Sequence, residues 1–156
     1  MTIPLRLAST ADAALIARLN RNVQFWHAQH YPEAFFPEPD AAALTEHFRA
    51  RLAGDGVYCF LAGEPVMGYA LCALQSRELS LFSPPVKRLM VDHIAVEPEA
   101  RRQGLASALL ARAKDLARAL QCDEILLDTW AENHEAHAFF RKMGFAPRRM
   151  LFHAKP

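Results

Sequence analysis

The sequence lacks the two glycine-rich patterns that most often mark nucleotide-binding chains. Gly-x-x-x-x-Gly-Lys-Ser/Thr does not occur, and neither does the three-glycine fingerprint of dinucleotide-binding domains. The whole chain of 156 residues contains only six glycines. A P-loop or a dinucleotide fold is therefore unsupported, and any phosphate site must use a different turn.

The sequence also lacks an excess of charge and long apolar runs. Lysine and arginine (18) nearly balance aspartate and glutamate (17), so the net charge is +1. Whole-molecule attraction to nucleic acid or to an anionic membrane has no support. No stretch approaches the ~20 apolar residues of a membrane span, and residues 1–6 do not resemble a signal segment. We expect a cytoplasmic protein that binds neither nucleic acid nor membranes.

Cysteine is scarce and odd in number. Cys59, Cys72 and Cys122 each lie in or beside an apolar segment. This pattern disfavours a disulfide framework and a Cys-x-x-Cys metal site. We predict reduced thiols that pack in the core.

Two histidine pairs have a spacing that permits a shared metal ion. His27 with His30, and His134 with His137, are three residues apart, so each pair falls on one helix face. The second pair is one residue short of the zinc-protease motif His-Glu-x-x-His. Solvated histidines are the favoured interpretation, and we expect no metal.

The length and a hydrophobic content of 52% fit one domain over residues 1–156. Alternation and helical periodicity place loops at 27–40 and 76–85. The segment 89–128 forms a strand, helix, strand unit, expected to be a right-handed crossover with parallel strands. The pattern predicts strands at 3–7, 57–62, 65–74, 89–96, 124–128 and 145–152, and helices at 13–26, 41–53, 105–121 and 133–143.

The most informative stretch runs from the strand at 89–96 into the helix that begins near Leu105. The first N–H groups of a helix have no intrahelical partner, and the helix dipole adds partial positive charge, so this turn can hold a phosphate. Gly104 and Ala106 leave room for it. Taken alone, the same turn also fits close helix packing without a ligand.

Two motifs together resemble the GNAT superfamily of N-acetyltransferases that use acetyl-CoA. Arg101, Gly104 and Ala106 match the Arg/Gln-x-x-Gly-x-Gly/Ala cofactor motif after a strand. The stretch from Asn133 to Phe145 is similar to Asn-x-x-Ala-x-x-Phe/Leu-Tyr-x-x-x-Gly-Phe at the usual distance. The resemblance covers residues 89–145, about a third of the chain.

This resemblance implies an α/β (α+β) fold: a mixed, mostly antiparallel central sheet with a splayed parallel strand pair and flanking helices. It implies that acetyl-CoA lies in the splay, with the pantetheine arm on the strand edge and the pyrophosphate on backbone N–H groups. Asn133 is then expected beside pantetheine, and the Ile94 N–H is expected to polarise the acetyl carbonyl. The implied cofactor residues are Ile94, Ala95, Val96, Arg101, Arg102, Gln103, Gly104, Leu105, Ala106, Asn133 and Phe140. Arg101 and Arg102 also fit the simpler role of solvated cations.

Asp92 is the predicted general base for such a reaction, because an amine with a pKa near ~10 must lose a proton before attack. Residues two apart on a strand share a face, so Asp92 is expected to point the same way as Ile94, toward the acetyl end, and His93 the opposite way. His93 has the better intrinsic pKa, but a hydrogen-bonded core histidine is the favoured interpretation. Asp92 also fits a salt bridge or strand-end solvation.

Phe140 departs from the family pattern. The resemblance implies a tyrosine at this position, the general acid for the CoA thiolate, and phenylalanine has no proton to donate. A water, Tyr31 or Tyr69 could supply the proton, or the thiolate could leave unassisted, since a thiol of pKa ~8.5 is a fair leaving group.

The acceptor region is expected in the first two helices and their loop. Aromatic and acidic residues between Trp26 and Asp40 suit a small cationic amine, although the same aromatics also fit helix packing. We predict acceptor contacts from Trp26, His30, Tyr31 and Trp130.

Three functions remain open at this stage. The favoured one is acetylation of a small-molecule amine; the others are acetylation of a protein N-terminus or lysine, and non-catalytic acyl-CoA binding. The resemblance also allows a homodimer. The sequence does not identify the amine or the length of the acyl group.

Overall fold

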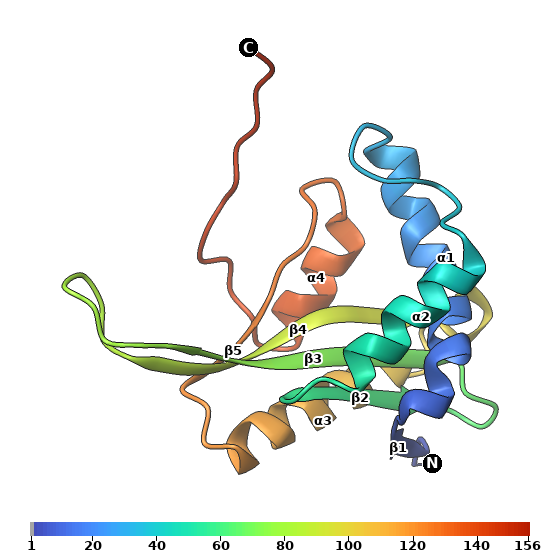
Figure 1. The fold of residues 1–156 in the computed structure, drawn as a ribbon, viewed down its shortest axis with the longest axis horizontal. Coiled ribbons are helices and arrows are strands. Elements are labelled where there is room, and N and C mark those ends of the chain that lie inside the picture. Colours follow the sequence, from blue (N-terminus) through green and yellow to red (C-terminus); the bar gives the residue numbers. More distant parts are fainter. Residues whose placement is uncertain (1) are drawn as a thin grey trace.

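The computed structural model describes residues 2–156, in which one five-stranded sheet is flanked by helices (Figure 1). The strand order is β1-β2-β3-β4-β5. Neighbouring strands are antiparallel from β1 to β4, and β5 is parallel to β4. The predicted mixed sheet is confirmed. The elements are β1 (Leu5–Leu7), η1 (Thr10–Asp12), α1 (Ala13–His30), α2 (Ala41–Leu52), β2 (Val57–Ala62), β3 (Gly68–Arg77), β4 (Val86–Val96), η2 (Pro98–Ala100), α3 (Leu105–Ala119), β5 (Glu124–Leu127) and α4 (His134–Lys142).

Apolar side chains from both faces of the sheet form the core. On one face, Ile16 of α1 and Phe48 of α2 pack against the fully buried Tyr69 and Leu71 of β3. On the other face, residues of α3 such as Leu110 pack against β3 and β4, and α4 adds Phe140. Cys59 and Cys72 are buried and unpaired, and burial raises the pKa of each thiol to about 12. The prediction of reduced core thiols is confirmed for these two.

A β-bulge in β4 overturns the predicted orientation of Asp92. Leu71 pairs with His93 and the next residue, Cys72, pairs with Val91, so Asp92 is the extra residue on β4. An inserted residue breaks strict alternation. Asp92 therefore points to α2, where it binds Arg51, instead of sharing the face of Ile94, which packs against the α3 side.

Several predicted boundaries were wrong, including the start of β4, which lies at Val86 instead of residue 89. Helix α1 continues to His30, so the first loop covers residues 31–40. Strand β3 begins at Gly68 and reaches Arg77, because Met67 N–H bonds to the Ala62 carbonyl (2.9 Å) and closes the turn. No strand follows α4 in the described residues, whereas the pattern predicted one at 145–152.

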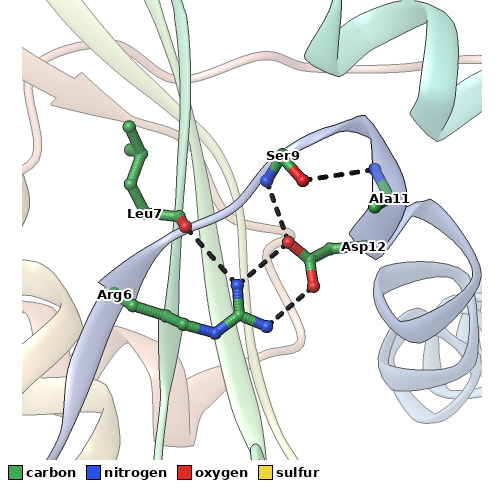
Figure 2. Close-up of polar contacts among 5 residues, drawn as sticks. All are labelled: Arg6, Leu7, Ser9, Ala11 and Asp12. Carbon is green, nitrogen blue, oxygen red and sulfur yellow. Dashed lines mark hydrogen bonds and ion pairs between the residues drawn. The ribbon is translucent and has the colours of Figure 1, made fainter.

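The segment between β1 and α1 is fixed by a capping box (Figure 2). The Ser9 hydroxyl accepts from Ala11 N–H, and the Asp12 carboxylate accepts from Ser9 N–H (2.8 Å). Arg6 donates to both carboxylate oxygens of Asp12, at 2.7 and 3.0 Å. These bonds satisfy donors that a helix start leaves open and hold α1 beside the sheet.

We expect Asp12→Ala to lower the free energy of unfolding by about 1 kcal/mol near neutral pH, because the cap and the ion pair are lost together. The Arg6 guanidinium holds the pKa of the Asp12 carboxyl below its usual range. Stability from a depressed carboxyl pKa is present above the ordinary value of about 4 and disappears as the pH falls through the folded-state value. Urea unfolding at neutral and acidic pH measures both effects.

The matched control is Asp115→Ala, which removes an exposed ion pair with Arg118 on α3. Its effect should stay within about 0.5 kcal/mol. A difference between wild type and Asp12→Ala that does not shrink in acid would contradict the role of the Arg6 pair.

Candidate active site

The turn before α3 has the geometry of an anion site. Arg102 (φ 60°) and Gly104 (φ 88°) are both in the left-handed region, and Gly104 is the N-cap of α3. Within residues 2–156, the N–H groups of Arg102, Gln103 and Gly104 donate to no protein acceptor. Successive free N–H groups at a helix start attract a phosphate. Leu105 is buried and anchors the helix start, whereas Arg101, Arg102 and Gln103 are exposed.

Strands β4 and β5 part beside this turn. Residues Arg88–Val91 of β4 pair with Glu124–Leu127 of β5. Beyond Val91, β4 continues to Val96 without β5. The Glu97 N–H bonds to the Met67 carbonyl (2.8 Å) on the β3 side. Since N–H directions alternate along a strand, the N–H groups of Ile94 and Val96 point away from β3, into the open side. The predicted splayed pair is therefore present, with two backbone donors facing it.

Asn133 and Phe140 both belong to α4, the helix that follows β5, or to its cap. Asn133 is the N-cap, its Oδ1 accepts from Ala136 N–H (3.2 Å), and its Nδ2 donates to no protein acceptor within residues 2–156. Phe140 is buried among core residues that include Cys72 and Leu110. Its ring therefore helps to position α4 against the sheet.

Asp92 lies at the edge of a cavity on the α2 side of the sheet. The cavity has a volume of about 510 Å³, and His47 and Gln75 also line it. Arg51 Nη2 donates to Asp92 Oδ2 at 2.5 Å, which leaves Oδ1 free of that ion pair. An acceptor amine placed in this cavity would meet a fixed negative charge.

Sequence reasoning missed Arg51 and His47 at this site. A cation in the last turn of a helix is expected from the helix dipole alone, so Arg51 carried no signal of its own. It reaches Asp92 across 41 positions of sequence, a contact that only the packing of α2 on β4 creates.

His93 belongs to a buried polar chain. Asn20 Nδ2 donates to Tyr69 Oη (2.9 Å), and Tyr69 Oη lies 3.1 Å from His93 Nδ1. Because Tyr69 accepts from Asn20, its own proton is available to His93. Burial lowers the pKa of His93, which favours the neutral ring. The interpretation of His93 as a hydrogen-bonded core histidine is supported by this geometry.

An aromatic cluster joins the end of α1 to the loop between β5 and α4. Trp130 lies against Tyr31 (ring centroids 4.4 Å apart) and Phe35 (5.1 Å). The Tyr31 hydroxyl accepts from Glu132 N–H (3.2 Å). His30 stacks on Trp26 at 3.9 Å. The structure thus brings Tyr31 and Trp130 together from positions 99 apart, and adds Phe35, which lies in the expected acceptor region but was not among the predicted contacts.

The structure has a second cavity, away from Asp92. A second cavity of about 740 Å³ lies between α1, the loop 31–40 and α2, where Arg18, Arg21 and Glu38 line it. Within residues 2–156, no three metal-ligating side chains converge, and no helix has the length and apolar character to cross a bilayer.

A sheet with one parted parallel pair, an open strand edge and a helix start with free N–H groups at its end is the arrangement that the resemblance to the GNAT superfamily implied. The model of the acetyltransferase (GNAT) family matches residues 21–145, and the chain belongs to this family.

Curated relatives match part of the chain. Human N-acetyltransferase 8 is 41% identical over 59 residues, which are 38% of this chain and 26% of that protein. Human N-alpha-acetyltransferase 30 is 29% identical over 96 residues, 60% of this chain and 25% of that protein. The chain therefore spans about a quarter of the length of these relatives.

Solved structures match the fold over nearly the whole chain. The BH1408 protein from Bacillus halodurans has a TM-score of 0.88 at 19% identity, covering 98% of this chain and 99% of that chain. The aminoglycoside N-acetyltransferase AAC(6')-Iy in complex with CoA has a TM-score of 0.77 at 18% identity, covering 99% and 95%. At these identities the likeness shows the fold.

We expect Gly104→Val to raise the Kd for CoA at least about tenfold, because a branched side chain at a left-handed N-cap distorts the turn that presents the N–H groups. Gly144→Val is the matched control, since Gly144 has the same φ of 88° but lies after α4. Both variants should lose about 1–2 kcal/mol of stability from backbone strain. Calorimetric titration with CoA separates them, and equal affinities would contradict a phosphate site at this turn.

Proposed function

We propose that this chain transfers an acetyl group from acetyl-CoA to the primary amine of a small-molecule acceptor, by direct attack in a ternary complex. The proposal rests on the place where β4 and β5 part. The turn before α3, with its free N–H groups, follows the parted end of β4, and Asp92 lies at the start of the parting, beside a cavity. Donor and acceptor can then approach from different sides of the same strand.

The donor is held mainly by backbone. The N–H groups of the turn from Arg102 to Ala106 bind the pyrophosphate, and the pantetheine arm pairs with the open edge of β4 at Ile94–Val96. The Ile94 N–H, which points into the splay, donates to the acetyl oxygen as negative charge develops there. One such donor is typically worth about 3 kcal/mol in the transition state. Asn133 Nδ2 contributes a hydrogen bond to pantetheine.

Asp92 carries the acceptor side of the reaction. The amine nitrogen bonds to the thioester carbon, the carbon–sulfur bond breaks, and the amine proton passes to Asp92 Oδ1 directly or through one water. Arg51 keeps Oδ2 occupied and so orients Oδ1 toward the cavity. Asp92 and Ile94 are thus the proposed catalytic groups, one by side chain and one by backbone.

The CoA thiolate needs a proton, or must leave as the anion. Phe140 has no acidic proton, and Tyr69 is fully buried with its hydroxyl engaged by Asn20 and His93. The Tyr31 hydroxyl accepts from Glu132 N–H and retains its own proton. Of these two tyrosines, Tyr31 is therefore the one with a proton to donate, with a water or unassisted departure as the alternatives at a thiol pKa of ~8.5.

The aromatic cluster supports a small acceptor. Tyr31, Phe35 and Trp130 pack together where an extended peptide would need an open groove. Aromatic faces attract a cationic amine, and Trp26 and His30 join the same cluster through His27, which lies against Trp26, Phe35 and Trp130.

The deciding experiment incubates the purified chain with acetyl-CoA and a panel of polyamines, amino acids, aminoglycosides and peptides, and follows free thiol release. Turnover with a small amine supports the proposal. Turnover confined to N-terminal or lysine peptides supports the second candidate, which the match to N-alpha-acetyltransferase 30 favours. Acetyl-CoA binding without any turnover supports a binding module.

We expect Asp92→Asn to lower kcat/KM about 10²–10⁴-fold, since an amide cannot take the amine proton. The loss should be greatest at acidic and neutral pH, where most of the amine is protonated, and smaller as the pH nears the amine pKa. Asp92→Glu, which restores the carboxylate, should recover part of the rate. A pH–rate profile unchanged by Asp92→Asn would remove Asp92 as the base.

A further inference from the structure

The second cavity lies on the side of α1 that faces away from the sheet. Arg18, Arg21 and Phe25 line it, and their spacing of three and four residues places them on one face of the helix. Ile16 and Leu19 are buried on the sheet side of the same helix, in the core that it shares with β2 and β3. The body of α1 therefore stands between this cavity and the core.

The loop at residues 31–40 forms another wall of the cavity. It turns back from the end of α1 toward the start of α2 (Figure 1). Gln24 Nε2 on α1 donates to the Phe36 carbonyl (2.7 Å) and ties the loop to the helix, while Pro37 and Pro39 line the cavity. The volume of about 740 Å³ is within the range of small-molecule sites in proteins.

The cavity holds charges of both signs that are not paired with each other. Arg18, Arg21 and Glu38 all line it, and none of them forms an ion pair in the described part of the chain. Glu97 also lines it but is engaged, because its Oε2 accepts from Asn22 Nδ2 (2.7 Å). Two cations and one carboxylate are therefore left to meet a ligand.

We propose that this cavity binds a free α-amino acid with a large apolar side chain. Arg18 and Arg21 hold the carboxylate, since guanidinium groups bind carboxylates through paired N–H donors. Glu38 accepts from the ammonium group. The apolar side chain packs on Phe25, which is 50% exposed, and on Leu44 of α2. A zwitterion satisfies the charges of both signs, which neither an amine nor a carboxylate does alone.

The bound amino acid also restrains a loop that borders the aromatic cluster. Phe35 stacks on His27 (ring centroids 4.8 Å apart) and lies 5.1 Å from Trp130. Pro37 is two residues further along the same loop and lines the cavity. A ligand that holds Pro37 in place therefore limits the movement of Phe35. The amino acid is not the acceptor in this site, because its ammonium group pairs with Glu38.

The first test titrates the purified full chain, without acetyl-CoA, with L-phenylalanine, L-leucine, L-methionine and L-tryptophan in a calorimeter. We expect at least one of them to bind with a Kd below about 1 mM. The N-acetyl form of that amino acid lacks the ammonium group and the decarboxylated amine lacks the carboxylate, so each should bind at least about tenfold more weakly. No binding by any of the four, or equal binding of either analogue, would overturn the site.

The second test locates the bound amino acid with variants. The double variant Arg18→Gln/Arg21→Gln should raise the Kd at least about tenfold, and Glu38→Gln should also raise it. These side chains are exposed, so the variants should fold as the wild type does. Arg118→Gln is the matched control, an exposed cation on α3, and should leave the Kd unchanged. Asp92→Asn should also leave it unchanged, because Asp92 lines the other cavity.

A Kd that the double variant leaves unchanged would contradict the assignment, as would a loss of binding in Asp92→Asn, which would move the amino acid to the acceptor cavity. Hydrogen exchange supplies a readout of the loop itself. The tightest-binding of the four amino acids, at saturation, should slow amide exchange in residues 31–40 of the wild type and not of the double variant. Unchanged exchange in this loop at saturation would show that the amino acid binds elsewhere.

Discussion

The parting of β4 from β5 is the constraint on which the rest of the site depends. Pairing stops at Val91 and Leu127, and β4 continues alone to Val96. On the other side of β4 the ladder with β3 is continuous except for the bulge at Asp92. β4 is thus held by β3 on one side, while its opposite edge stays open. The N–H groups of Ile94 and Val96 on this open edge lie directly before the turn at Gly104.

In the proposed reaction, backbone groups bind the donor and side chains bind the acceptor. The donor side uses N–H groups of β4 and of the α3 start, which depend on local conformation at Arg102 and Gly104 and only weakly on side-chain identity. The acceptor side uses side chains from separate elements: Asp92 from β4, Arg51 from α2, and Trp130 from the loop after β5. This explains why the donor-binding motif can be recognised in the sequence, whereas the acceptor-binding residues cannot.

Much of the fold was predictable because local patterns agreed with it. A helix from residue 13 was expected, and the capping box of Ser9 and Asp12 stands directly before α1. The strand, turn and helix around Gly104 were also found from periodicity and a single glycine. The orientation of Asp92 was not predictable, because a bulge inserts one residue without leaving a mark on the apolar pattern. The strand predicted at 145–152 is absent from the described residues for a different reason: a strand needs a partner edge as well as suitable residues.

The sequence by itself determined the family, the elements and the anion-binding turn, because capping, periodicity and left-handed glycine positions act over a few residues. Only the tertiary structure decided which side chain meets Asp92, how Tyr31 reaches the loop after β5, and that Tyr69 is engaged by Asn20 and His93. Each of these contacts joins residues 24 or more positions apart. Such contacts depend on how helices pack on the sheet, and packing is a property of the whole core.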